Sequence, residues 1–218
     1  MKTDKIIVEL KKILKEQDLF KLNELIEKLE QQELESKYIS KPSDKKRLSA
    51  IKKVLESSGI RPVLGCFTKI DDNVYFTDSY QLYKLNDESL PFTYATNNTN
   101  LTQEEEEYVK KNNLKVYPGI YPNLKNIIPT NSPKTTYKVN AEELLKQEKM
   151  TLPERGKKIH TINTGIGNIS FDLIYIKNVI NILKLTGDFE LELYGDINPI
   201  IIRNKEDEIG LILPIKVY

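Results

Sequence analysis

The sequence predicts an α+β protein in which helices pack on antiparallel sheets and an N-terminal helical extension precedes the core. Apolar residues recur at helix spacing from the start of the chain to about Lys37. A second strong helical pattern covers Leu173 to Leu185. Three strand patterns close the chain and mix apolar runs with single charges, which is typical of an antiparallel sheet with one covered face.

The amino-acid composition limits the classes of function that this protein can have. The 218 residues fit one large domain or two small ones. Lys and Arg number 33 against 32 Asp and Glu, so any DNA contact would need charge sorted onto one face. The single cysteine, Cys66, excludes an intrachain disulfide and favours a reducing cytoplasm, and its apolar context predicts a buried side chain. Neither a signal peptide nor a membrane-spanning run is recognisable, so we expect a cytoplasmic protein without a membrane partner.

Residues 1–40 are expected to form the helical extension. Its apolar positions at helix spacing are Ile6, Leu10, Ile13, Leu14, Leu22, Leu25, Ile26 and Leu29. Gln17 and Asp18 lie between the two repeats, so the segment is either a helical hairpin or one long bent helix. It could serve self-association or pack on the rest of the chain.

The next region predicts a helix followed by a hairpin. Pro42 ends the preceding helix, Ser43 or Asp44 caps a new helix over residues 45–58, and Gly59 suits its C-terminal cap. The runs PVLGCFTKI and VYFTDSYQLYKL follow as two strands, with IDDN as the turn between them.

The middle of the chain is irregular. Residues 86–100 are polar and rich in turn residues. Thr102 and Glu105 form a capping box for a short acidic helix ending near Asn112. Four prolines in residues 115–133 exclude a long regular element, and we place a domain boundary near Thr130.

The second part begins with the strand TTYKVN, whose Asn140 caps a short helix. One or two strands follow around Gly165 and Gly167, and Gly187 is expected to end the helix that begins at Leu173. The closing strands are FELELYG, NPIIIRN and IGLILPIKV. Pro214 within the last run predicts an edge strand, where a missing N–H costs little.

Three stretches resemble the bacterial DNA polymerase III beta subunit, the DNA sliding clamp. IRPVLGCFTKIDDNVYFTDSYQL resembles its middle domain, with a Thr-Asp-x-x-x-Leu signature at Thr77, Asp78 and Leu82. IYPNLKNIIPTN resembles the junction to the last domain. The chain from Ile169 to Tyr218 resembles the final half-domain, including a Pro-x-Lys/Arg ending. The resemblance implies clamp-like half-domains, each a helix packed on antiparallel sheet.

The sequence also departs from the clamp pattern. Clamps of this family have three such domains, whereas this chain has room for two, which we place at residues 44–129, truncated, and 130–218. The helix and three strands expected between Leu85 and Tyr121 are not recognisable, and the N-terminal helices have no counterpart. A two-domain chain would close a ring only as a homo-oligomer.

The resemblance implies a non-enzymatic processivity factor that encircles duplex DNA and contacts phosphates independently of sequence. The basic residues of the helices that would face DNA are Lys45, Lys46, Arg47, Lys52, Lys53, Lys177 and Lys184. The alternative is that these helix faces are simply solvated.

The resemblance also implies an interdomain cleft that takes short linear peptides of polymerases or repair proteins. The matching positions are Leu64, Thr77, Ser79, Tyr80, Gln81, Leu82, Pro122, Asn126, Ile127, Leu213, Pro214 and Ile215. Asn126 replaces a basic residue common in the family, and Tyr80 and Gln81 replace its usual His-Arg pair. A typical clamp-binding peptide is therefore expected to bind weakly, and the alternative is that these residues are only core.

Other chemistries have little support. With one histidine, His160, and one cysteine far away in the chain, a zinc site or a Cys-His pair is not indicated, and no catalytic residue or cofactor is predicted. GIGN, residues 165–168, is too short for a dinucleotide loop. A different hypothesis is a structural or regulatory protein that acts through its N-terminal helices and does not encircle DNA.

Overall fold

The computed structural model describes residues 3–16, 18–57, 61–86, 89–96 and 100–216. The chain divides into two compact units, Met1–Ser40 and Lys41–Tyr218, which are considered separately. Gly59, the predicted helix cap, lies outside the described residues.

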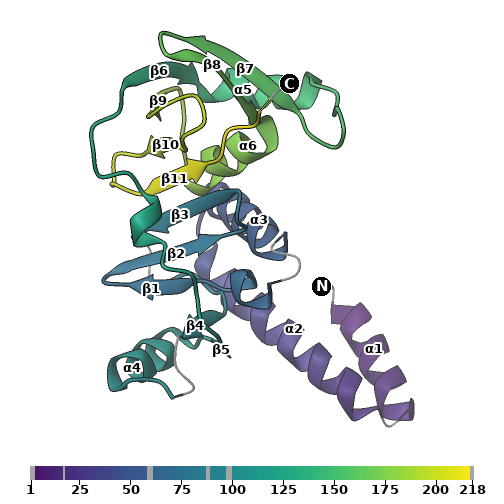
Figure 1. The fold of residues 1–218 in the computed structure, drawn as a ribbon. Helices are drawn as coiled ribbons and strands as arrows, with labels where there is room; N and C mark the ends of the chain where they lie inside the picture. The colour runs from purple at the N-terminus through teal and green to yellow at the C-terminus, as the bar shows by residue number, and fades with distance from the viewer. Residues whose placement is uncertain (1–2, 17, 58–60, 87–88, 97–99, 217–218) are drawn as a thin grey trace. The chain divides into compact units, whose positions relative to one another are not determined.

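The first unit is a pair of helices, α1 (Thr3–Glu16) and α2 (Leu19–Tyr38) (Figure 1). The Asp18 side chain caps α2 by accepting a hydrogen bond from the Lys21 N–H at 3.1 Å. Ile13 and Leu25 are buried. The structure therefore has the hairpin and not one long bent helix.

The second unit is built on a seven-stranded sheet in the order β1-β2-β3-β11-β10-β9-β6. Its strands are β1 (Thr68–Ile70), β2 (Asn73–Thr77), β3 (Gln81–Leu85), β6 (Thr135–Asn140), β9 (Asp188–Leu193), β10 (Ile200–Arg203) and β11 (Ile209–Ile212). All neighbours in it pair antiparallel. The sheet is continuous through the β3–β11 seam, where Leu82 lies opposite Leu211, so it joins strands from both sides of residue 130. The division into domains 44–129 and 130–218 stays a prediction.

One face of the sheet is covered by α3 (Pro42–Glu56) and α6 (Leu173–Ile182), which pack against each other, while α5 (Ala141–Met150) packs on α6. Tyr83 and Phe76 stack on this side with ring centroids 4.9 Å apart. Gly210 of β11 brings the backbone close to α6, since a Cβ there would lie 3.0 Å from a methyl carbon of Val179. This helix-covered face fits the predicted half-domain layout.

Two small sheets and one further helix complete the unit. The strands β4 (Tyr94–Thr96) and β5 (Val116–Pro118) pair in parallel, and β7 (Ile159–Thr164) pairs antiparallel with β8 (Gly167–Asp172). Between β4 and β5 lies α4 (Gln103–Asn112), whose Thr102–Glu105 capping box confirms the prediction.

Two predicted strands are wrong in part. Pro62–Gly65 forms a 3-10 turn, so the first strand begins only at Thr68. The run from Val74 to Leu85 is broken into β2 and β3 by a turn. There the Asp78 carboxylate accepts hydrogen bonds from the Tyr80 and Gln81 N–H groups at 2.9 Å, an arrangement that competes with strand pairing.

The predicted limits of two helices also need correction. Lys41, and not Ser43 or Asp44, is the N-cap of α3, because Pro42 takes the first helical position. Asp44 instead accepts a hydrogen bond from the Lys41 N–H at 2.9 Å. The helix α6 ends at Ile182 and not at Leu185, and Lys184, with φ of 53°, turns the chain before Gly187.

Two further segments differ from prediction. The stretch 86–100, predicted as turns, contains the strand β4, whose Tyr94 and Ala95 are buried. The closing strand ends at Ile212, so Pro214 lies beyond it and not inside an edge strand.

Candidate functional site

A cavity of about 270 Å³ opens beside the β3–β11 seam, and we call it the junction groove. Its lining residues are Arg61, Leu64, Thr77, Ser79, Tyr80, Gln81, Leu82, Pro122, Leu124, Ile127, Leu211 and Leu213. Successive strand residues point to opposite faces of a sheet. Since Tyr83 and Gly210 face the helix layer, their neighbours Leu82 and Leu211 face the groove side.

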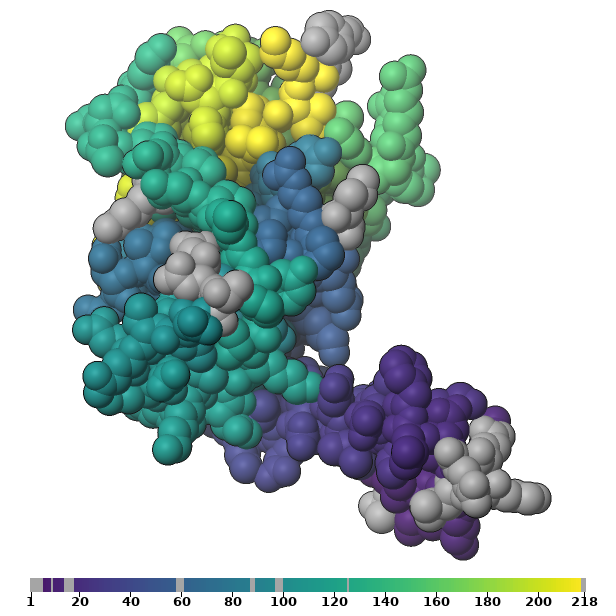
Figure 2. All heavy atoms as spheres, turned by 60° about the horizontal axis from the view of Figure 1, so that its bottom comes forward, coloured from purple at the N-terminus to yellow at the C-terminus, as the bar shows by residue number. Residues whose placement is uncertain are grey.

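The floor of the junction groove is part of a buried apolar cluster that includes Leu64, Leu82 and Leu211. The junction segment, residues 115–133, covers this cluster, with Leu124 buried in it and the Tyr121 hydroxyl donating to the Cys66 carbonyl at 3.3 Å. Figure 2 shows this green-teal segment beside the blue residues 61–86. The groove is therefore an open hollow whose base consists of buried apolar side chains.

The turn between β2 and β3 shapes one side of the groove. The Gln81 side chain is buried. Its amide donates to Asp78 at 2.7 Å, and its carbonyl oxygen accepts from Tyr83 at 2.8 Å and from Asn178 at 3.3 Å. Burial, followed by the charge of Asp78, raises the pKa of the Tyr83 hydroxyl. Gln81 therefore fixes the turn through bonds within the protein, and Ser79 and Tyr80 project from it.

Tyr80 forms an open aromatic rim of the groove. Its side chain is 57% exposed and stacks on Tyr175 of α6, with centroids 6.2 Å apart and planes at 11°. Burial, with the nearby carboxylates of Asp78 and Asp172, raises the pKa of Tyr175 to about 12. The Tyr175 hydroxyl therefore stays protonated at physiological pH.

The C-terminal tail forms another wall. The Leu213 N–H donates to the Tyr80 carbonyl at 2.9 Å, and the Ile215 N–H donates to the Ser170 carbonyl of β8 at 2.7 Å. Pro214 lies between these two anchors, where a residue without an N–H is tolerated. The tail is thus held to two different elements after the strand has ended.

Most of the predicted cleft residues come together in this groove. Those that line it are Leu64, Thr77, Ser79, Tyr80, Gln81, Leu82, Pro122, Ile127 and Leu213. Asn126, Pro214 and Ile215 are not among the lining residues. Sequence reasoning missed Arg61, Leu124 and Leu211. Leu211 could have been found from the sequence, because it lies two residues before the predicted Leu213 and so falls on the same face of the predicted closing strand.

The predicted basic residues divide into two groups. Lys45, Lys46, Lys52 and Lys53 are exposed on the outer side of α3. Arg47 is 4% exposed and pairs with Glu208 at 2.7 Å, so its placement on a DNA-facing surface is wrong. It shares the inner helix side with Leu48 and Ile51, because residues three and four apart lie on one face.

The two predicted lysines of α6 are engaged in ion pairs. Lys177 pairs with Glu148 of α5 at 2.9 Å, and Lys184 pairs with Asp44 of α3 at 2.9 Å. Their side chains remain partly exposed. Their charge is therefore partly neutralised by carboxylates of the protein itself.

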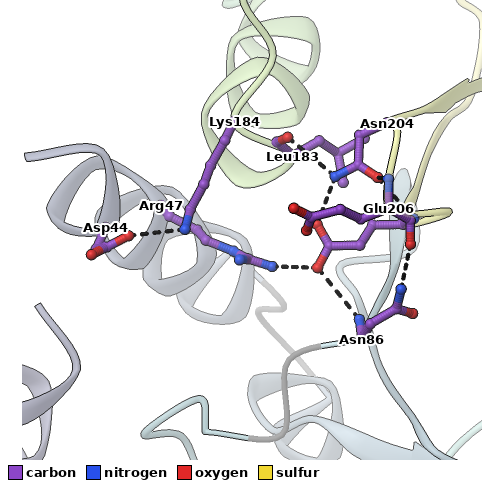
Figure 3. A network of polar contacts seen from close by, with 8 residues as sticks. Asp44, Arg47, Asn86, Leu183, Lys184, Asn204 and Glu206 are labelled. Atoms are coloured by element: carbon purple, nitrogen blue, oxygen red, sulfur yellow. Dashed lines mark hydrogen bonds and ion pairs between the residues drawn. The ribbon is translucent and has the colours of Figure 1, made fainter. Parts of the chain in front are cut away.

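The buried carboxylate of Glu208 takes part in a polar network with Arg47, Asn86 and Asn204, three residues that Figure 3 labels. Glu208 accepts from Arg47 at 2.7 Å, from the Asn204 side chain at 2.8 Å and from the Asn86 N–H at 3.4 Å. The Asn204 oxygen in turn accepts from the Glu208 N–H at 2.9 Å. The network ties α3 to the β10–β11 turn and to the end of β3.

The histidine, the cysteine and the clusters of acidic side chains are the groups that could form a metal or nucleophile site. No group of three or more His, Cys, Asp or Glu side chains there could hold a metal ion. His160 packs edge-on against Phe171 at 5.4 Å, and burial lowers its pKa. Burial raises the pKa of the Cys66 thiol to about 11, which leaves it protonated and unreactive at neutral pH. Among the described residues, no helix is both long and apolar enough to span a membrane.

Comparisons with known proteins identify the fold. No protein-family model and no curated protein matches the sequence. The solved Bacillus subtilis DNA polymerase sliding clamp aligns with a TM-score of 0.52 and 17% identity, over 81% of this chain and 63% of that one. The Helicobacter pylori beta clamp with diflunisal aligns with a TM-score of 0.53 and 14% identity, over 79% and 64%. The same clamp bound to a DNA ligase peptide gives 0.52 and 14%, over 79% and 63%.

The described chain therefore has the α+β fold of bacterial DNA polymerase III beta sliding clamps, as its sequence predicted. The chain spans less than two thirds of the length of the clamps it matches. At this low sequence identity, the similarity establishes the fold and leaves the function to be argued from the site.

Proposed function

We propose that this chain is a non-enzymatic, clamp-like protein of DNA replication or repair that holds short linear peptides in the junction groove. The observation that carries the proposal is the groove itself, an apolar hollow walled by the β2–β3 turn, the junction segment and the C-terminal tail. The H. pylori clamp, which shares the fold, was solved with a DNA ligase peptide bound.

The groove has the chemistry of a peptide site. Its volume is near the lower end of small-ligand pockets, which suits a few side chains of a peptide and not a whole domain. Its floor is apolar, and Arg61 is the one charged residue among its described lining residues. An arginine there would favour a peptide with a carboxylate next to its apolar side chains.

DNA contact is the second part of the proposal. The exposed lysines of α3, namely Lys45, Lys46, Lys52 and Lys53, could meet phosphates without reading sequence. Encircling a duplex would require a homo-oligomer. We also propose the cytoplasm as the compartment, where the free thiol of Cys66 stays reduced.

A second candidate function is that of an interaction protein acting through its N-terminal helices. The observation that favours it is the exposure of Val8, Leu19 and Phe20 on α1 and α2. In that case the clamp-like unit would be a scaffold, and deletion of residues 1–40 would abolish partner binding.

Fluorescence polarisation tests the peptide proposal, with a labelled DNA ligase peptide of the kind bound to the H. pylori clamp. Ile127→Glu places a charge at the groove edge, where the native side chain is 43% exposed, so folding should be unaffected. We expect an affinity loss of at least tenfold. Ile197→Glu is the control, because Ile197 is also exposed, at 60%, and is not among the lining residues of the groove. Equal affinities for both variants and the wild type would exclude the groove.

A further inference from the structure

Two adjacent apolar side chains are exposed to solvent at the start of α2. Leu19 is 74% exposed and Phe20 is 72% exposed, while Ile13 and Leu25 fill the inside of the helix pair. The Asp18 cap holds this first turn in place. We call residues 18–20 the hairpin tip. An exposed pair of large apolar side chains at a fixed turn is typical of an interaction surface.

The junction groove is complementary to the hairpin tip in apolar character and charge. Its floor of Leu64, Leu82 and Leu211 suits two neighbouring apolar side chains. Arg61 suits the carboxylate of Asp18, which directly precedes them. Asp18 now pairs with Lys21 at 3.0 Å in a solvent-exposed ion pair, and such pairs are weak enough to be exchanged.

Four other exposed apolar side chains fit the groove less well. Met150 and Leu152 are not directly preceded by a carboxylate: Lys149 comes before Met150, and Glu154 is followed by Arg155 after Leu152. Ile197 stands alone between polar neighbours, and Ile120 adjoins the groove wall itself. Charge therefore favours the hairpin tip over these four side chains.

We propose that the junction groove of one copy of this protein binds the hairpin tip of a second copy. This inference rests on the proposed function of the groove as a peptide site. The contact joins two different surfaces of the two copies, so it is a head-to-tail interface, which generates closed rings or open chains. It would supply the homo-oligomer that a two-domain clamp-like chain needs in order to surround DNA.

Sedimentation velocity over a hundredfold range of protein concentration tests the proposal on the full chain. We expect the mass of the wild type to rise with concentration and that of the Leu19→Ser, Phe20→Ser double variant to stay at the monomer. Both side chains are exposed, so the substitutions leave the buried core intact. The matched control, Met150→Ser with Leu152→Ser, should associate like the wild type. A wild type that remains monomeric throughout would overturn the proposal.

Mixing variants tests the head-to-tail geometry. The tip double variant retains an intact groove, and Ile127→Glu retains an intact tip. Each alone should be a monomer, and the equimolar mixture should form a heterodimer with twice the mass. Absence of the heterodimer would contradict a contact between tip and groove.

A synthetic peptide of residues 15–24, titrated into the tip double variant, separates the two proposals. Binding that Ile127→Glu abolishes supports both. If the DNA ligase peptide binds in the groove and the 15–24 peptide does not, the self-association proposal fails while the proposed function stands. If neither peptide binds, the proposed function fails as well.

Discussion

The two faces of the β3–β11 seam differ in how they are closed. On the helix face, α3 and α6 cover the strands, and the buried Arg47–Glu208 pair ties α3 to the β10–β11 turn. On the groove face, the floor of Leu82 and Leu211 lies under a hollow, and Tyr80 stands largely in water at its edge. Packed helices thus stabilise one face of the sheet, whereas the other face keeps an open apolar hollow, the place where we propose that peptides bind.

The largest expected effect is the removal of one partner of the buried ion pair on the helix face. Arg47→Met leaves the buried Glu208 carboxylate without its charged partner, which should lower the free energy of unfolding by about 3–5 kcal/mol. Urea denaturation followed by circular dichroism measures it. The double variant Arg47→Met, Glu208→Leu should recover most of the loss. A single variant as stable as the wild type would mean that the two faces do not differ as described.

A smaller loss is expected from filling the close approach of sheet and helix. Gly210→Ala introduces a Cβ that would lie 3.0 Å from a methyl carbon of Val179, so the Val179 side chain must give way by a few tenths of an ångström. Overpacking of this kind typically costs about 1–3 kcal/mol. The same denaturation experiment checks it, with Gly165→Ala, where nothing lies within 4 Å, as the control. An equal cost at both glycines would argue against tight packing on the helix face.

The helix layer should also carry a pH dependence. Hydrogen bonds from Lys177 and Lys158 hold the pKa of Glu148 below its ordinary value of 4.5. The folded state therefore binds that proton less readily than the unfolded chain, and the stability gained is full above pH 4.5 and is lost as the pH falls through the folded pKa. Charged hydrogen bonds of this kind contribute about 1.5–3 kcal/mol each.

Denaturation of Glu148→Gln against the wild type, between pH 7 and pH 3, measures this contribution. The stability difference should be largest near pH 7 and shrink below pH 4.5. A difference that is constant across the range would show that the carboxylate charge is not the cause.

The smallest effect on stability is expected at the groove rim. Tyr80→Ala should change the free energy of unfolding by only about 0.5 kcal/mol, because the side chain is mainly exposed. Peptide affinity should fall several-fold, since an aromatic wall is removed. Polarisation and urea denaturation on the same sample compare the two quantities. A large loss of stability without a change in affinity would mean that Tyr80 serves packing, like the residues of the helix face, and not peptide binding.

The predicted fold class and most groove residues followed from local patterns and from the clamp resemblance. Capping signals such as Thr102 with Glu105 act within a few residues, so they could be recognised in the sequence. Hydrophobic periodicity could not reveal two features. The break at Asp78 depends on hydrogen bonds from its side chain to the turn, and the strand β4 depends on parallel pairing with the distant β5. Arg47 was misplaced because its partner, Glu208, is distant in the chain, and basic residues are usually expected at the surface.

Backbone amide NMR of the ¹⁵N-labelled chain during titration with the DNA ligase peptide shows directly where the peptide binds. We expect shift changes concentrated at the groove amides of Ser79, Tyr80, Ile127 and Leu213, with Lys45 and Lys52 on α3 unaffected. Shift changes confined to the N-terminal helices, or none at millimolar peptide, would contradict the proposal that peptides bind in the groove.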